Sequence, residues 1–167
     1  DKTADILYQR CVEAGMLDQI DPDRPVPALR IPFHLNGTVT MQMFWDSDLG
    51  KTIETAAYCV YRKPNPALEA KIDAVIDMFE KLQQEDGYLS SWYQRMEPGK
   101  RWTNLRDNHE LYCAGHLIEG AVAYYQATGK RKLLDVMSRY ADHIGTVFGP
   151  NPGQRKGYCG HEELELA

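Results

Sequence analysis

The stretch ELYCAGHLIEGAVAYYQATGKRKLLDVMSRYADHI, residues 110–144, decides the fold. Its first part is apolar almost all round, which predicts a helix that other elements cover on both sides. Gly129 then provides a C-terminal cap. From Lys130 to about Phe148 the apolar residues form a single stripe, which is typical of a helix with one face in water. The stretch therefore predicts a hairpin of one inner and one outer helix.

The same alternation occurs earlier in the chain. Apolar residues at helical spacing predict a helix that starts near residue 46, with Asp46 or Ser47 as its N-cap. A Lys-Pro-Asn-Pro run ends this helix, and Pro66 can stand in the first turn of the next one. That second helix carries one apolar stripe: Leu68, Ile72, Val75, Ile76, Phe79 and Leu82. Successive hairpins of this kind predict an all-α fold, an α/α toroid or solenoid.

Such an arrangement places the N-termini of the inner helices on one rim. We expect three segments there, with a third inner helix starting at His161: residues 45–48, 108–110 and 160–162. Helix N-termini offer free N–H groups and partial positive charge, and His, Glu and Asp add hydrogen-bonding groups. We also expect flat aromatic faces nearby, from Trp45, Trp92, Tyr93 and Trp102. This mixture suits a hydroxyl-rich ligand such as a sugar.

The first 44 residues predict an irregular N-terminal segment with a short helix at roughly Ala4–Leu17, and residues 45–167 form the helical domain. Prolines interrupt the segment after its helix and exclude a regular element there. A second irregular stretch, from residue 85 to about 107, is long and rich in Tyr and Trp. Long loops of this kind in a small domain often carry function.

Composition excludes several classes of protein. The 167 residues carry a net charge of -5 and 43% hydrophobic residues, without a basic cluster or a membrane-spanning run. We therefore expect neither nucleic acid nor membrane as a partner. The four cysteines are widely scattered, which favours reduced thiols and a cytoplasmic location over a disulfide framework: Cys11, Cys59, Cys113 and Cys159.

Structural roles compete with functional ones for most of these polar residues. Acidic residues in a first helical turn are favoured by the helix dipole, which alone can account for Glu110, Glu162 and Glu163. Asp46 and Asp48 could act as an acid and base, but a capping role is favoured. We interpret His34 and His143 as ordinary polar residues.

A metal site is a further alternative. His109, Cys113 and His116 share one helical face and could chelate a transition metal. We rank this alternative below packing of Cys113 in the core.

The blocks DNHELYCAGHLIEGAVAYYQATGKRKLLDVMSRYADHI and GYCGHEELELA closely resemble glycoside hydrolase family 127, the β-L-arabinofuranosidase family. FWDSDLGKTIETAAY and QQEDGYLSSWY resemble earlier segments of the same family. The resemblance extends from about residue 40 to residue 167. It implies that the chain forms the first part of an (α/α)6 catalytic barrel, which in the family precedes β-sandwich domains. The chain therefore looks like a fragment of a longer protein.

The resemblance also implies a retaining, exo-acting glycosidase with a cysteine nucleophile, a glutamate acid/base and a zinc site of cysteines and a glutamate. In the family pattern all of these lie beyond residue 167, so we expect no catalytic residue, metal or cofactor within this chain. Sugar binding carries over to His109 and to the turn Cys159-Gly160-His161. The family often has Pro at the position of Cys159. We therefore do not expect Cys159 to be the nucleophile.

We therefore expect a fragment of a glycoside hydrolase that releases L-arabinofuranose or a similar sugar from non-reducing ends. By itself the chain should be inactive. It should self-associate or pair with a missing C-terminal part, because inner-helix residues such as Leu117, Ile118 and Tyr125 would otherwise lie uncovered. The alternative function is a non-catalytic binding or interaction domain of helical hairpins.

Overall fold

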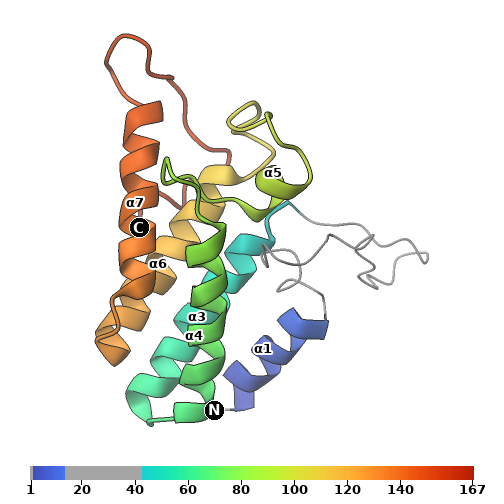
Figure 1. Ribbon diagram of the computed structural model, residues 1–167, viewed down its shortest axis with the longest axis vertical. Coiled ribbons are helices and arrows are strands. Elements are labelled where there is room, and N and C mark those ends of the chain that lie inside the picture. The colour runs from blue at the N-terminus through green and yellow to red at the C-terminus, as the bar shows by residue number, and fades with distance from the viewer. Residues whose placement is uncertain (1, 14–42) are drawn as a thin grey trace, which may run out of the picture.

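The computed structural model describes residues 2–13 and 43–167. These ranges contain six helices and no strand (Figure 1), which confirms the all-α prediction: α1 (Lys2–Glu13), α3 (Trp45–Arg62), α4 (Pro66–Leu82), α5 (Ser91–Arg95), α6 (Glu110–Thr128) and α7 (Lys132–Val147). The N-terminal helix was predicted to continue to Leu17. His34 and the proline-rich run lie outside the described residues. Within those residues, no helix is long and apolar enough to cross a membrane.

The helices form two hairpins, α3–α4 and α6–α7. Helix α3 packs most extensively on α6, whereas α4 contacts α3 and α7. In Figure 1 the two inner helices, α3 and α6, start at the same end of the molecule, and the outer helices return in the opposite direction. The alternation of inner and outer helices is therefore as predicted. The inner helices bring their N-termini to one end.

Glycines let the two inner helices touch along their backbones. A Cβ atom on Gly50 of α3 would lie 2.6 Å from the carbonyl oxygen of His116, and one on Gly120 of α6 would lie 2.7 Å from the carbonyl oxygen of Gly50. Real Cβ atoms do not approach other atoms so closely. The small residues thus set how near α3 and α6 lie, and hence how near their first turns lie.

Two helix ends, the start of α4 and the end of α6, follow the sequence signals. Asn65 caps α4 by accepting a hydrogen bond from the Leu68 backbone N–H at 3.1 Å, and Pro66 begins the helix. Gly129 ends α6 in the left-handed conformation, at φ 72°. All six residues of the predicted α4 stripe are buried. Helix α7 starts two residues later than predicted, and Ala141, one of the apolar residues in its sequence, is exposed.

The predicted cap of α3 is wrong. Phe44 occupies the N-cap position and makes no side-chain cap, while Asp46 and Ser47 are buried in the first turn. The Ser47 hydroxyl donates to the Phe44 carbonyl at 2.6 Å. The Asp46 carboxylate instead accepts two hydrogen bonds from Ser91 of the long loop, described below.

The predicted third inner helix is also wrong. Residues 161–167 contain only a turn, in which the Leu166 N–H donates to the Glu163 carbonyl at 3.1 Å. Leu166 is 77% exposed, whereas Leu164 is partly buried and packs against the core without a helix. A helix needs a costly first turn that packing normally stabilises. Here contacts with α6 hold the segment in a non-helical path.

Candidate functional site

His109 stands where the first turns of α3 and α6 meet. Its backbone has φ 58°, a left-handed conformation that His adopts more readily than most residues. Its ring lies 5.6 Å from the ring of Phe44, centroid to centroid. Nδ1 lies 2.6 Å from the Asp107 carbonyl oxygen. This arrangement fixes the imidazole just before α6 begins.

His161 lies directly against His109. The centroids of the two imidazoles are 5.1 Å apart. Tyr112, one turn into α6, lies 5.4 Å from His109 and 5.2 Å from His161. The structure therefore confirms that both imidazoles lie on one rim, although the helix expected to carry His161 does not form. We call these three side chains, His109, Tyr112 and His161, the ring cluster.

The turn Cys159-Gly160 directly precedes His161 in the chain and fixes its position. Gly160 donates its N–H to the Leu105 carbonyl at 3.2 Å. A Cβ at this position would collide with the Arg106 carbonyl, so only glycine fits. Cys159 is buried, and its thiol donates to the carbonyl of His161. Burial raises the pKa of this thiol, which favours its neutral form. Both residues shape the turn, and their predicted contact with a sugar stays a prediction.

Two buried carboxylates hold the long loop against the inner helices. Glu110 accepts hydrogen bonds from the Tyr88 hydroxyl and the Trp102 backbone N–H, both at 2.6 Å. Burial raises the pKa of Glu110 to about 7. Asp46 accepts from the N–H and the hydroxyl of Ser91 at 2.8 and 2.5 Å. These tertiary contacts exceed what the helix-dipole and capping interpretations assigned to Glu110 and Asp46.

The aromatic residues expected in the cleft mostly belong to the core. Trp45 and Tyr93 are each 1% exposed and Trp102 is 6% exposed. Trp92 is partly buried, and its indole N–H donates to Glu97 at 3.1 Å. The expectation was wrong because the loop folds back over the helix ends. Phe44 and Tyr112 contribute the aromatic faces instead, and sequence analysis missed both. Helical spacing from His109 could have found Tyr112.

Lys51 adds a cation beside the ring cluster. Its Nζ donates to the Tyr112 hydroxyl at 2.7 Å and lies 3.7 Å from Asp48. Burial raises the pKa of Asp48, and the nearby Lys51 charge partly opposes that effect. Asp48 is thus an ion-pair partner on α3 and does not face Asp46 as a second acid. Sequence analysis did not identify Lys51.

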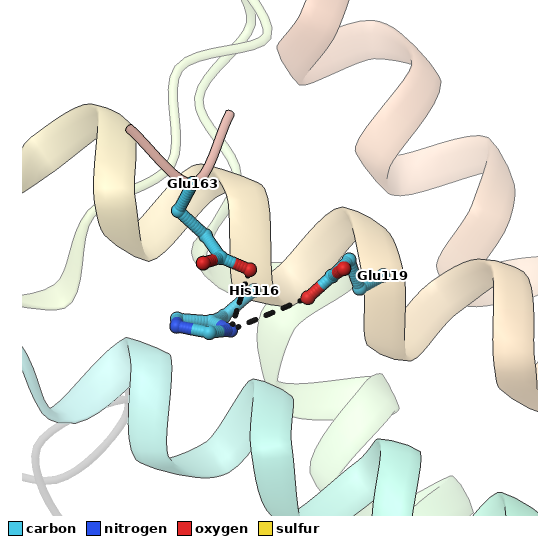
Figure 2. Close-up of side chains that lie close together, drawn as sticks. All are labelled: His116, Glu119 and Glu163. Atoms are coloured by element: carbon cyan, nitrogen blue, oxygen red, sulfur yellow. Dashed lines mark ion pairs between the residues drawn. The ribbon is translucent and has the colours of Figure 1, made fainter. Parts of the chain in front are cut away.

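The proposed chelating face of α6 does not come together. Cys113 is buried, and desolvation raises the pKa of its thiol well above the ordinary value, which opposes the thiolate that a metal would need. His116 instead faces two carboxylates, with Nδ1 at 3.1 Å from Glu163 and 3.4 Å from Glu119 (Figure 2). Burial lowers the pKa of His116. A hydrogen bond with Glu163 raises the pKa of Glu119.

The remaining candidates lie elsewhere. His143 is on α7, with Nδ1 at 2.9 Å from the Asp86 carbonyl, in keeping with an ordinary polar role. Glu162 is exposed. Leu117, expected to lie uncovered, is buried, whereas Ile118 is partly buried and Tyr125 is 37% exposed.

Comparison with known proteins places these features in a family. Residues 3–167 match the family described as "Beta-L-arabinofuranosidase, GH127 catalytic domain". A non-reducing end β-L-arabinofuranosidase from Bifidobacterium longum subsp. longum is 42% identical over 130 residues, which are 75% of this chain and 20% of that protein.

Two solved structures resemble the chain over almost its whole length. A GH127 β-L-arabinofuranosidase from Geobacillus stearothermophilus matches with a TM-score of 0.79 and 46% identity, over 98% of this chain and 27% of that one. A second structure, described as a GH127 β-arabinofuranosidase, matches with a TM-score of 0.83 and 34% identity, over 98% of this chain and 26% of that one. The chain thus spans between 20% and 27% of the length of these three relatives.

Proposed function

Since the chain belongs to the glycoside hydrolase family 127 catalytic-domain family, we propose that it is part of a retaining glycosidase and contributes sugar-binding residues. The substrate that we propose carries L-arabinofuranose, or a similar sugar, at a non-reducing end. The observation that supports this most is the contact of His109 with His161, whose ring centroids are 5.1 Å apart. The names of the relatives agree with such a substrate.

The ring cluster offers the groups that a monosaccharide needs. In a neutral His109 ring, Nδ1–H donates to the Asp107 carbonyl, which leaves Nε2 as an acceptor for a sugar hydroxyl. His161 is exposed and can donate or accept. The Tyr112 ring adds an apolar face for sugar C–H groups. Since Tyr112 packs beside both imidazoles, a five-membered sugar ring that contacts them would lie next to its ring.

None of the described residues is a good candidate for cleaving the glycosidic bond. Burial raises the pKa of Glu110 to about 7, but this residue is 2% exposed and both of its oxygens accept hydrogen bonds, so it cannot reach a substrate. The Cys159 thiol donates a hydrogen bond to the His161 carbonyl within the same turn, so it does not face a substrate. We therefore propose that the nucleophile, the acid/base and the zinc site belong to other parts of the enzyme, in keeping with the resemblance. The chain alone should not hydrolyse an aryl β-L-arabinofuranoside.

We test the sugar-binding role in the full-length protein that contains this chain, with an aryl β-L-arabinofuranoside as substrate. His109→Ala and His161→Ala should each lower kcat/KM by roughly 3- to 10-fold or more, as expected for a lost hydrogen bond to a sugar hydroxyl. His143→Ala is the matched control and should leave the kinetics unchanged. Equal damage from His143→Ala would contradict the proposal. An inactive wild-type protein that still binds the sugar would favour the alternative, a non-catalytic binding domain.

A second part of the proposal concerns assembly. Helix α3 exposes Tyr58 and Tyr61 at 57% and 74%, and α6 exposes Val122 and Tyr125 at 37% each. Large exposed apolar side chains in neighbouring inner helices favour coverage by another protein surface. We propose self-association of the isolated chain or contact with the remainder of the enzyme. Light scattering of the isolated chain at high concentration should show a mass above the monomer, and a clean monomer would argue against this.

A further inference from the structure

His116, Glu119 and Glu163 converge outside the ring cluster. His116 and Glu119 lie one turn apart on α6, and Glu163 reaches them from the C-terminal segment (Figure 2). His116 Nδ1 is 3.1 Å from a Glu163 oxygen and 3.4 Å from a Glu119 oxygen. One ligand atom from each residue lies within 4.8 Å of the others, and in the described part of the chain this is the one group of its kind.

Apart from His116 itself, no cationic side chain of the described residues pairs with the two carboxylates of this group. Nδ1 of His116 is inaccessible to solvent and makes no hydrogen bond of normal geometry with any described residue. No Lys or Arg of the described ranges forms an ion pair with Glu119 or Glu163. The nearby Lys51 is engaged by Asp48 and by the Tyr112 hydroxyl. A cation bound between this nitrogen and the two carboxylates would satisfy all three groups, and the competing arrangement is a proton held by His116 or shared by the glutamates.

The spacing suits a metal ion. First-row divalent cations bind imidazole nitrogen and carboxylate oxygen at about 2.0–2.2 Å, so neighbouring ligand atoms stand about 3.0–3.5 Å apart. The two distances from His116 Nδ1 fall in this range. The site is also partly preformed, because Gly115 lets the Glu163 backbone come close: a Cβ there would lie 2.9 Å from the Glu163 carbonyl carbon.

We propose that His116, Glu119 and Glu163 bind one first-row divalent cation, of the Mn²⁺ or Zn²⁺ type, with water completing its coordination. The ion would fasten the C-terminal segment to α6 and keep His161 beside His109. This site differs in ligands from the cysteine-rich zinc site of the family pattern, and it revises our expectation of no metal within the chain. It does not depend on glycosidase activity.

The test is a titration with Mn²⁺, read by electron paramagnetic resonance and by calorimetry, on the full-length protein after saturation with Zn²⁺ and dialysis against a weak chelator. Any Zn²⁺ bound at His116 should exchange with added Mn²⁺. We therefore expect the protein to bind one equivalent of Mn²⁺ at this site. Glu163→Gln and Glu119→Gln should each weaken that equivalent by about 10-fold or more. Both changes are near-isosteric and should retain the fold, which circular dichroism checks.

Glu80→Gln is the matched control, since Glu80 shares an acidic cluster with Asp77 around Lys132 but has no histidine in it. It should leave Mn²⁺ binding unchanged. Mn²⁺ should also raise the melting temperature of the wild type more than that of Glu163→Gln. If Glu163→Gln binds Mn²⁺ as tightly as the wild type does, the three residues do not form a metal site and instead share a proton. Equal weakening of Mn²⁺ binding in Glu80→Gln would lead to the same conclusion.

Discussion

Two segments of this chain carry the same His-Glu pair in opposite surroundings. At 108–110 the glutamate is 2% exposed, accepts two hydrogen bonds and is followed by a 19-residue helix. At 160–162 the glutamate is exposed and no helix follows. Both histidines nevertheless reach the ring cluster. The comparison teaches that the pair itself specifies neither a helix nor a burial state.

The two segments are also held by different forces. The start of α6 is fixed from outside, because the loop of residues 83–109 closes over Glu110 and Asp46 with buried hydrogen bonds. The C-terminal segment is held mainly by its approach to Gly115 and to His116, and by the Gly160 N–H. We therefore expect changes in the first segment to affect global stability and changes in the second to affect local order.

The largest expected effect is that of Glu110→Ala. It leaves the Tyr88 hydroxyl and the Trp102 N–H buried without a partner, which should lower the free energy of unfolding by about 4 kcal/mol. Glu162→Ala, in the exposed pair, should change it by less than about 0.5 kcal/mol. Urea denaturation of both variants measures the contrast. Similar values for the two would show that the two regions are held alike.

The next effect is a dependence on pH. Because the folded pKa of Glu110, about 7, lies above the ordinary 4.5, the folded state binds this proton more tightly than the unfolded chain does. Its contribution to stability is thus complete below pH 4.5 and is lost as pH rises towards 7, by up to about 3 kcal/mol.

The pKa of Asp46 is raised too and adds a loss of the same sign. We therefore compare the wild type with Glu110→Gln by urea denaturation from pH 4.5 to 8. As pH rises, the free energy of unfolding of the wild type should fall relative to that of Glu110→Gln. A parallel pH dependence in both would exclude Glu110 as the source.

A third effect separates the inner from the outer helices. Gly120→Ala places a methyl group against the Gly50 backbone of α3, which should destabilise the protein by about 2 kcal/mol. Gly145→Ala on α7 meets no atom within 4 Å and removes a flexible residue from a helix, so it should stabilise by about 0.5–1 kcal/mol. Thermal melts with opposite shifts are the expected result. Shifts of one sign would contradict the close helix contact.

The smallest effect on stability is expected for Gly115→Ala. The new methyl group meets Glu163 and Leu164 at 2.8–2.9 Å, so the C-terminal segment should move away from α6. The gain in helix propensity offsets part of the lost contact, and the net change should stay within about 1 kcal/mol. A glutamate-specific protease should then cut at residues 162–165 several times faster than in Gly145→Ala. Unchanged cleavage would mean that other contacts hold the segment.

The sequence by itself determined the helices of both hairpins. The apolar stripe of α4, its Asn65-Pro66 start and the Gly129 cap are local signals, and each formed as predicted. The all-round apolar pattern of α6 also predicted its inner position next to α3. Such features depend on the 3.6-residue period and on caps, which act within a few residues along the chain.

Only the tertiary structure decided the surroundings of the polar residues. In the sequence, Glu110 and Asp46 looked like residues that favour a helix start. In the structure both are buried, and they accept hydrogen bonds from groups that lie between 8 and 45 residues away in the chain. The segment at His161 was predicted to begin an inner helix, but Gly115 on α6 admits its backbone in a non-helical conformation. Hydrogen bonds and close contacts between distant residues leave no local pattern. For that reason the meeting of His116 with Glu163 was also invisible in the sequence.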